Sequence, residues 1–214
     1  NFKGGESQQL RVLARIGYHS IKQTGQNPED QDSGNDIMTE GDVIVEEQPL
    51  EGGAKLSVVH NLGRQSVSNF IADSPFMSLP GVETIPVLHN PEVHNNMGRQ
   101  ERMMDAFCYL EEAVASQDDE SKISGFGVVS NGLSLPPEHP LHLDWRNVLE
   151  VACRAAETVT GSHSHLSVLQ LPANLLETRG VQVARDIHHH VRSSPFLSSD
   201  ADYMPKNLEV YAMR

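Results

Sequence analysis

The chain has 214 residues, which is enough for one domain with a substantial hydrophobic core. Its formal net charge is −13 at pH 7, which argues against nucleic acids and anionic membrane surfaces as partners. No stretch approaches the ~20 consecutive apolar residues of a membrane span. We expect a cytoplasmic protein, with an organellar one as the alternative, because the N-terminus that would carry a targeting peptide is expected to be missing. Two cysteines, Cys108 and Cys153, are too few for a disulfide framework and are expected to be buried, reduced thiols.

The first quarter of the chain reads as one short strand followed by a long polar segment. Residues 1–10 read as a loop that enters a helix, and residues 12–18 are predicted to form a strand with Gly17 near its end. Residues 19–55 contain Asn-Pro, Ser-Gly, Glu-Gly and Gly-Gly pairs among scattered acidic residues. This composition favours a solvated acidic loop insertion or disorder, with a short strand at residues 42–46.

Extended and helical patterns alternate in the middle of the chain. Residues 57–60 are predicted to be extended, and an apolar run ends at His89. A helix is predicted over residues 64–74, with an apolar face of Val67, Phe70 and Ile71. A second, amphipathic helix is predicted over residues 98–116 from the spacing of Met103, Phe107, Leu110 and Val114. Glu111 and Glu112 are assigned to the solvated face of this helix.

The alternation continues to the end of the chain. Residues 123–131 form a second apolar run, and a third begins at residue 166 and contains Gln170. Between them, Asp144 is predicted to cap a helix over residues 145–159. A final strand is predicted over residues 208–213, after a helix whose apolar face is Val181, Ala184, Ile187 and Val191.

Strands that alternate with helices indicate parallel βαβ units, and the chain supplies about five such strands. A complete (β/α)₈ TIM barrel usually needs roughly 250 residues. The predicted fold class is therefore α/β, with an incomplete barrel of about strands three to seven. We expect residues 1–214 to be one such partial domain, cut from a longer protein, with the acidic insertion at about residues 19–55.

Polar residues stand at the ends of the three apolar runs. The first run ends in His89-Asn90-Pro91-Glu92 and the second in Ser130-Asn131. The third contains Gln170, with Asn174 and Glu177 beyond it. In parallel barrels the C-terminal ends of the strands carry the active site, and a histidine there titrates near neutral pH. His89 is thus a candidate site residue, with a purely structural role at the strand end as the alternative.

These motifs resemble those of the aldo-keto reductase family over residues 80–177. The shared pattern is strand-His-Asn-Pro-Glu, strand-Gly-x-x-Ser-Asn and strand-Gln-x-Pro-x-Asn-Leu, in this order with helices between. The resemblance implies a (β/α)₈ barrel that uses NADP (NADPH) to reduce an aldehyde, ketone or sugar carbonyl. It assigns His89 to polarising the carbonyl, and it assigns Ser130, Asn131 and Gln170 to holding the nicotinamide amide.

The N-terminal part departs from the family pattern. In the family a tyrosine after strand two donates the proton and a lysine at the end of strand three lowers its pKa. Here Phe2 stands at the tyrosine position, where it cannot donate a proton, and Arg15 stands at the lysine position with a different reach and geometry. These departures support an alternative, a catalytically impaired cofactor-binding or regulatory protein on the same fold. A truncated, inactive product is a third interpretation.

The histidine-rich stretches do not have the spacing of metal sites. Consecutive helical residues point ~100° apart, so residues 188–190, three histidines in a row, cannot easily face one ion. His89 and His94 lie close in sequence but lack a third ligand. We predict a solvated helix surface for residues 188–190, and no metal.

Overall fold

The computed structural model describes residues 10–23, 42–51, 54–77, 79, 82–94, 98–116, 123–174, 176, 178–193 and 203–213. Phe2 and Glu177 lie outside the described residues, as does the predicted loop over residues 1–10 apart from Leu10, which begins a strand. The elements in chain order are β1 (Leu10–Ile16), β2 (Tyr18–Gln23), β3 (Val43–Pro49), β4 (Lys55–His60), α1 (Arg64–Asp73), β5 (Val82–His89), the 3₁₀ turn η3 (Pro91–His94), α2 (Arg99–Ala115), β6 (Phe126–Val129), the 3₁₀ turn η4 (Gly132–Ser134), α3 (Trp145–Val159), β7 (Leu166–Pro172), α4 (Thr178–Ser193) and β8 (Glu209–Met213).

Five parallel strands form the main sheet, in the order β1-β5-β6-β7-β8. In a flat sheet β1 and β8 would lie about 19 Å apart, because neighbouring strands are about 4.8 Å apart. Yet Arg11 on β1 reaches Glu209 on β8 at 2.9 Å and Glu83 on β5 at 2.9 Å. The sheet is therefore curled, and these ion pairs cross its concave face. The predicted α/β class and five parallel strands are confirmed, but the described residues form a curled half-barrel and no closed eight-stranded barrel.

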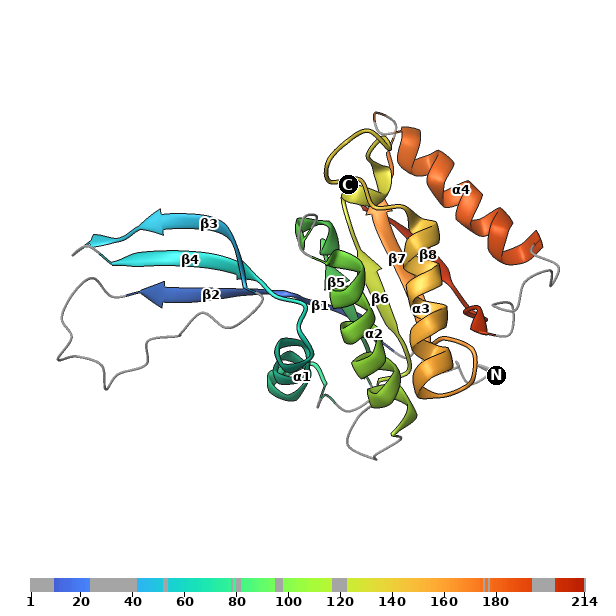
Figure 1. The fold of residues 1–214 in the computed structure, drawn as a ribbon, viewed down its shortest axis with the longest axis horizontal. Coiled ribbons are helices and arrows are strands. Elements are labelled where there is room, and N and C mark those ends of the chain that lie inside the picture. The colour runs from blue at the N-terminus through green and yellow to red at the C-terminus, as the bar shows by residue number, and fades with distance from the viewer. Residues whose placement is uncertain are drawn as a thin grey trace, which may run out of the picture.

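Both faces of this sheet are apolar, as a sheet with covered faces requires. Six residues of the central strands have no exposed surface: Val87, Leu88, Val128, Val129, Val168 and Leu169. On the convex face, Leu88, Val128 and Leu169 join a large cluster with the helices, which cover that face in Figure 1. On the concave face Val87, Val129 and Val168 form a smaller cluster with Ile85.

The predicted helices are confirmed within about two residues at each end. Asp144 caps α3 by accepting a hydrogen bond from the Arg146 amide at 2.9 Å. The solvated face predicted for Glu111 is wrong, because its side chain is fully buried. It accepts hydrogen bonds from the Ser164 hydroxyl at 2.7 Å and the His165 amide at 3.0 Å. This carboxylate therefore ties α2 to the segment that leads into β7.

The acidic insertion is not simply a loop. Its described parts form an antiparallel sheet in the order β2-β4-β3, which projects from the half-barrel (Figure 1). The short strand predicted at residues 42–46 is confirmed as β3, whereas β2 was missed. Ladder hydrogen bonds between antiparallel strands need no apolar pattern, and β3 is exposed along most of its length. The composition of this segment therefore gave no signal for pairing. Residues 24–41 lie outside the described residues.

Three smaller expectations can be compared with the structure. Both cysteines are free, but only Cys153 is buried, and Cys108 is half-buried. The histidines at residues 188–190 are exposed on α4, as predicted. No helix in the described ranges is long and apolar enough to cross a membrane.

Candidate functional site at the C-terminal rim

The C-terminal ends of β1, β5, β6 and β7, with the segments that follow them, form one edge of the half-barrel, which we call the rim. The register places His89 beside Val129, and Val129 beside Gln170. Ser130 and Asn131 follow directly. Because the four strands are parallel, the side chains predicted to form the site are brought to the same edge of the sheet.

Arg15 lies on β1, next to the strand that carries His89. Its register partner is Val87, two residues before His89, so both side chains point to the same face of the sheet. Burial lowers the pKa of His89, and the positive charge of Arg15 lowers it further. The imidazole of His89 is therefore neutral at pH 7, with one N–H to donate and one nitrogen to accept.

Gly17 lets the chain turn from β1 into β2 at the rim. Its φ of 120° lies in the region that favours glycine, and an added Cβ would lie 2.9 Å from the imidazole of His60. This turn brings Tyr18 back over the ends of the strands. The Tyr18 ring contacts His60 and His89 edge-on, with ring centroids 4.4 and 5.0 Å away.

Two buried histidines join the antiparallel sheet to the rim. His60 Nε2 lies 2.5 Å from the His89 carbonyl, so Nε2 carries the proton and donates it. His60 Nδ1 must then accept, and His94 Nε2 must donate to it across 2.8 Å. This order leaves His94 Nδ1 as a buried acceptor with no partner among the described residues. Burial lowers the pKa of each imidazole to about 4, and Arg102 adds to the effect at His94.

Glu92 fixes the turn that follows β5. Its buried carboxylate accepts a hydrogen bond from the Ser130 hydroxyl at 2.7 Å and one from the Gly132 amide at 2.9 Å. Ser130 has no exposed surface, so its hydroxyl holds the rim together and does not face the solvent. Of the three residues predicted to hold the nicotinamide amide, the other two, Asn131 and Gln170, are exposed or half-exposed.

A cavity of about 850 Å³ opens beside this rim. Arg15 and Tyr18 line it, together with residues of α1 and the turn after it. Its walls combine apolar side chains, such as Leu13 and Phe70, with amides such as Asn69. A pocket of this size with a few polar groups can hold a small organic molecule.

Comparison with protein-family models, curated proteins and solved structures finds no match to this chain. The geometry therefore carries the functional argument.

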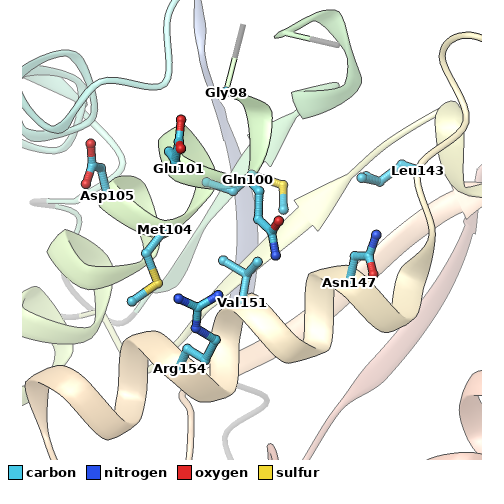
Figure 2. A pocket seen from close by; sticks show the side chains of 10 residues that line it. Gly98, Gln100, Glu101, Met104, Asp105, Leu143, Asn147, Val151 and Arg154 are labelled. Atoms are coloured by element: carbon cyan, nitrogen blue, oxygen red, sulfur yellow. The ribbon is translucent and has the colours of Figure 1, made fainter. Parts of the chain in front are cut away.

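A second cavity, of about 600 Å³, lies between α2 and α3 on the convex side (Figure 2). Gln100, Asn147 and Arg154 surround it, over a floor that includes Val151. None of the residues predicted from the sequence to form the site lines it. The rim is therefore the better candidate site.

Sequence reasoning missed several residues of the rim. Asn90 and Glu92 stand inside the His-Asn-Pro-Glu motif, which was a usable signal, yet only His89 was given a role. Tyr18 and His60 lie just outside the two ends of the insertion, in segments predicted to be extended, and neither was given a role. Their position depends on the turn at Gly17 and on the antiparallel pairing of Tyr18 with His60.

Proposed function

We propose that the protein is an NAD(P)H-dependent oxidoreductase that reduces an aldehyde, ketone or sugar carbonyl, as its resemblance to aldo-keto reductases implies. The observation that carries the proposal is the grouping of His89, Arg15, Asn131 and Gln170 at one rim of a curled parallel sheet, with the cavity of about 850 Å³ beside Arg15. In parallel α/β sheets, the C-terminal ends of the strands carry the active site.

The rim residues fit the carboxamide end of a nicotinamide. Each side-chain amide of Asn131 and Gln170 offers both a donor and an acceptor, which matches the donor and acceptor of the ligand's amide. Ser130 supports this arrangement indirectly, through its hydrogen bond to Glu92. A bound reduced nicotinamide would supply the hydride.

His89 and Arg15 would act on the carbonyl oxygen. The neutral imidazole of His89 would donate its N–H and polarise the carbonyl. The guanidinium of Arg15 would stabilise the negative charge that develops on that oxygen. Both groups would bind and orient the substrate before any proton is transferred.

The test is to mix the purified protein with NADPH and a simple aldehyde and to follow the loss of reduced cofactor. His89→Ala is expected to lower kcat by about 10²–10³-fold, the usual cost of losing one donor to a developing oxyanion. His188→Ala, on the exposed surface of α4, is the matched control and should leave kcat unchanged. Failure of the unaltered protein to oxidise NADPH with any of a panel of aldehydes, ketones and sugars would refute the proposal.

A second candidate is a protein that binds the cofactor without turnover. The observation that favours it is Arg15, a guanidinium where the family has the ammonium that activates the acid. Fluorescence titration with NADPH separates this candidate from an inactive fragment, because only a cofactor-binding protein gives a saturable change. Gln170→Ala should then weaken the affinity by about 2- to 10-fold, as expected for one lost hydrogen bond.

A further inference from the structure

Two histidines lie side by side at the start of β7, at the end of the half-barrel opposite to the rim. His163 and His165 flank Ser164 in the segment that leads into β7. Their ring centroids lie 6.1 Å apart, with the ring planes inclined by 44°. Five residues of extended chain, about 17 Å, separate His165 from Gln170 at the rim. This pair is therefore distinct from the rim and from the histidines of α4, on which the prediction of no metal was based.

Hydrogen bonds hold the backbone of this segment in place. The Ser164 amide donates to the Tyr203 carbonyl at 2.8 Å, and the His165 amide donates to the buried carboxylate of Glu111 at 3.0 Å. The Ser164 hydroxyl donates to the same carboxylate at 2.7 Å. Alternate side chains of an extended segment lie on the same side, which agrees with the contact between the rings of His163 and His165. The two imidazoles are thus presented together on a fixed support.

Glu111 also sets the tautomer of His165. Its second carboxylate oxygen lies 2.5 Å from His165 Nδ1, and a carboxylate can only accept, so Nδ1 carries the proton. The lone pair of the neutral imidazole is then on Nε2, and 29% of this side chain is exposed. In His163 the Nδ1 atom lies 3.2 Å from the Ser162 hydroxyl, which leaves its Nε2 for another partner. A carboxylate that fixes a histidine in this way is the usual outer partner of a histidine that binds a metal ion.

We propose that His163 and His165 bind one divalent transition-metal ion, such as Zn²⁺, through Nε2 of each imidazole. Two imidazoles that each hold a zinc ion at about 2.0 Å have ring centroids about 5–6 Å apart, close to the separation observed. No third His, Cys, Asp or Glu in the described part of the chain completes a set of three ligands, so water fills the other positions. Imidazole nitrogens suit Zn²⁺, Ni²⁺ and Cu²⁺, whereas Mg²⁺ and Ca²⁺ prefer oxygen ligands.

The charges near the pair predict an ion that exchanges with the solution. The Glu111 carboxylate behind His165 supplies one negative charge, whereas the ammonium of Lys206 near His163 opposes a cation. Partial burial lowers the pKa of His163, and Lys206 lowers it further, which favours the neutral imidazole that binds metals. With two protein ligands and one opposing charge, we expect a modest affinity and a protein that folds without the ion.

The test is a titration of the full chain, labelled with ¹⁵N-histidine, with ZnCl₂, followed by ¹H–¹⁵N correlation spectra of the ring nitrogens. Before zinc is added, His165 should show the tautomer with its proton on Nδ1. Zn²⁺ should then shift the Nε2 signals of His163 and His165 saturably, and Mg²⁺ should not. Glu111→Gln keeps an acceptor for Ser164, but its amide would donate to His165 Nδ1 and move the proton to Nε2. This variant should bind Zn²⁺ about 10- to 100-fold more weakly.

His163→Gln tests the pair without changing the interior, because the His163 side chain is only half-buried. It should abolish the saturable shift of His165. The matched control replaces residues 188–190 on the exposed face of α4 with glutamine, and its zinc affinity at the pair should equal that of the unaltered protein. Zinc shifts confined to residues 188–190, no shift of His163 and His165, or equal affinity in His163→Gln and the unaltered protein would overturn the proposal.

Discussion

The two sheets of this protein are stabilised by different interactions. Strands β5 to β7 are apolar on both faces, and residues such as Val87 and Val128 have no exposed surface. In the antiparallel sheet, β3 leaves Ile44 and Val45 almost half exposed, whereas β4 has buried residues near its end. The parallel half-barrel thus supplies the hydrophobic core, whereas the antiparallel sheet depends on its ladder and on the histidines that join it to the rim.

The largest difference in stability between the two sheets is expected when a buried side chain of the half-barrel is truncated. Phe126→Ala removes a fully buried ring that packs against Phe107, with centroids 5.1 Å apart. It should lower the free energy of unfolding by about 3–5 kcal/mol, measured by urea denaturation. Val45→Ala in β3 should change it by less than about 0.5 kcal/mol, because the side chain is exposed. Equal losses for the two variants would contradict the assignment of the core to the half-barrel.

Acid should weaken the junction between the sheets. The pKa values of His60 and His94 are about 4 in the folded protein and 6.5 ordinarily, so between these values the unfolded chain binds more protons. Stability is therefore present above pH 6.5 and lost as the pH falls toward 4, on the order of 3 kcal/mol for the pair. Urea denaturation at pH 7 and pH 5 measures the loss.

His60→Gln provides the matched test of this junction. Its amide could donate to the His89 carbonyl and accept from His94, without taking up a proton. The variant should therefore lose less stability between pH 7 and pH 5 than the unaltered protein. His188→Gln, on the exposed face of α4, should retain the original dependence. The same pH dependence in all three proteins would refute the role of the buried pair.

Two neighbouring carboxylates of α2 should differ less in their contributions to the stability of the half-barrel. Glu111→Ala leaves the buried Ser164 hydroxyl and the His165 amide without their acceptor, which should cost about 1–3 kcal/mol. Glu112→Ala removes a pairing with Arg64 at the surface and should cost at most about 1 kcal/mol. Thermal denaturation of the two variants would show the difference, and a larger loss for Glu112→Ala would contradict the structure.

The smallest effect on stability is expected for the ion pairs that cross the concave face of the half-barrel. Arg11 bridges Glu83 and Glu209, but the arginine is 38% exposed, so Arg11→Gln should cost only about 0.2–1 kcal/mol. The loss should shrink further in 1 M salt, since exposed ion pairs are screened. A loss that is large and independent of salt would mean that these pairs, and not the apolar faces, hold the curl of the sheet.

The same contrast explains what the sequence could predict. Continuous apolar runs identified β5, β6 and β7, and the polar residues that end them placed His89, Asn131 and Gln170 at one rim. Burial of Glu111 could not be read from the sequence, since it depends on what α2 packs against. The position of Tyr18 beside His89 could not be predicted either, because it follows from a turn at Gly17 and from pairing with a strand about forty residues further along the chain.

The most direct test of the central claim, that the rim binds a nicotinamide cofactor, is an NMR titration of ¹⁵N-labelled protein with NADPH. The side-chain amides of Asn131 and Gln170 report on the rim, and those of Gln100 and Asn147 report on the groove between α2 and α3. We predict saturable shifts of the Asn131 and Gln170 signals and of the backbone amide of Asn90, with Gln100 and Asn147 unmoved. Shifts confined to Gln100 and Asn147, or no shift at any of these amides, would contradict the account.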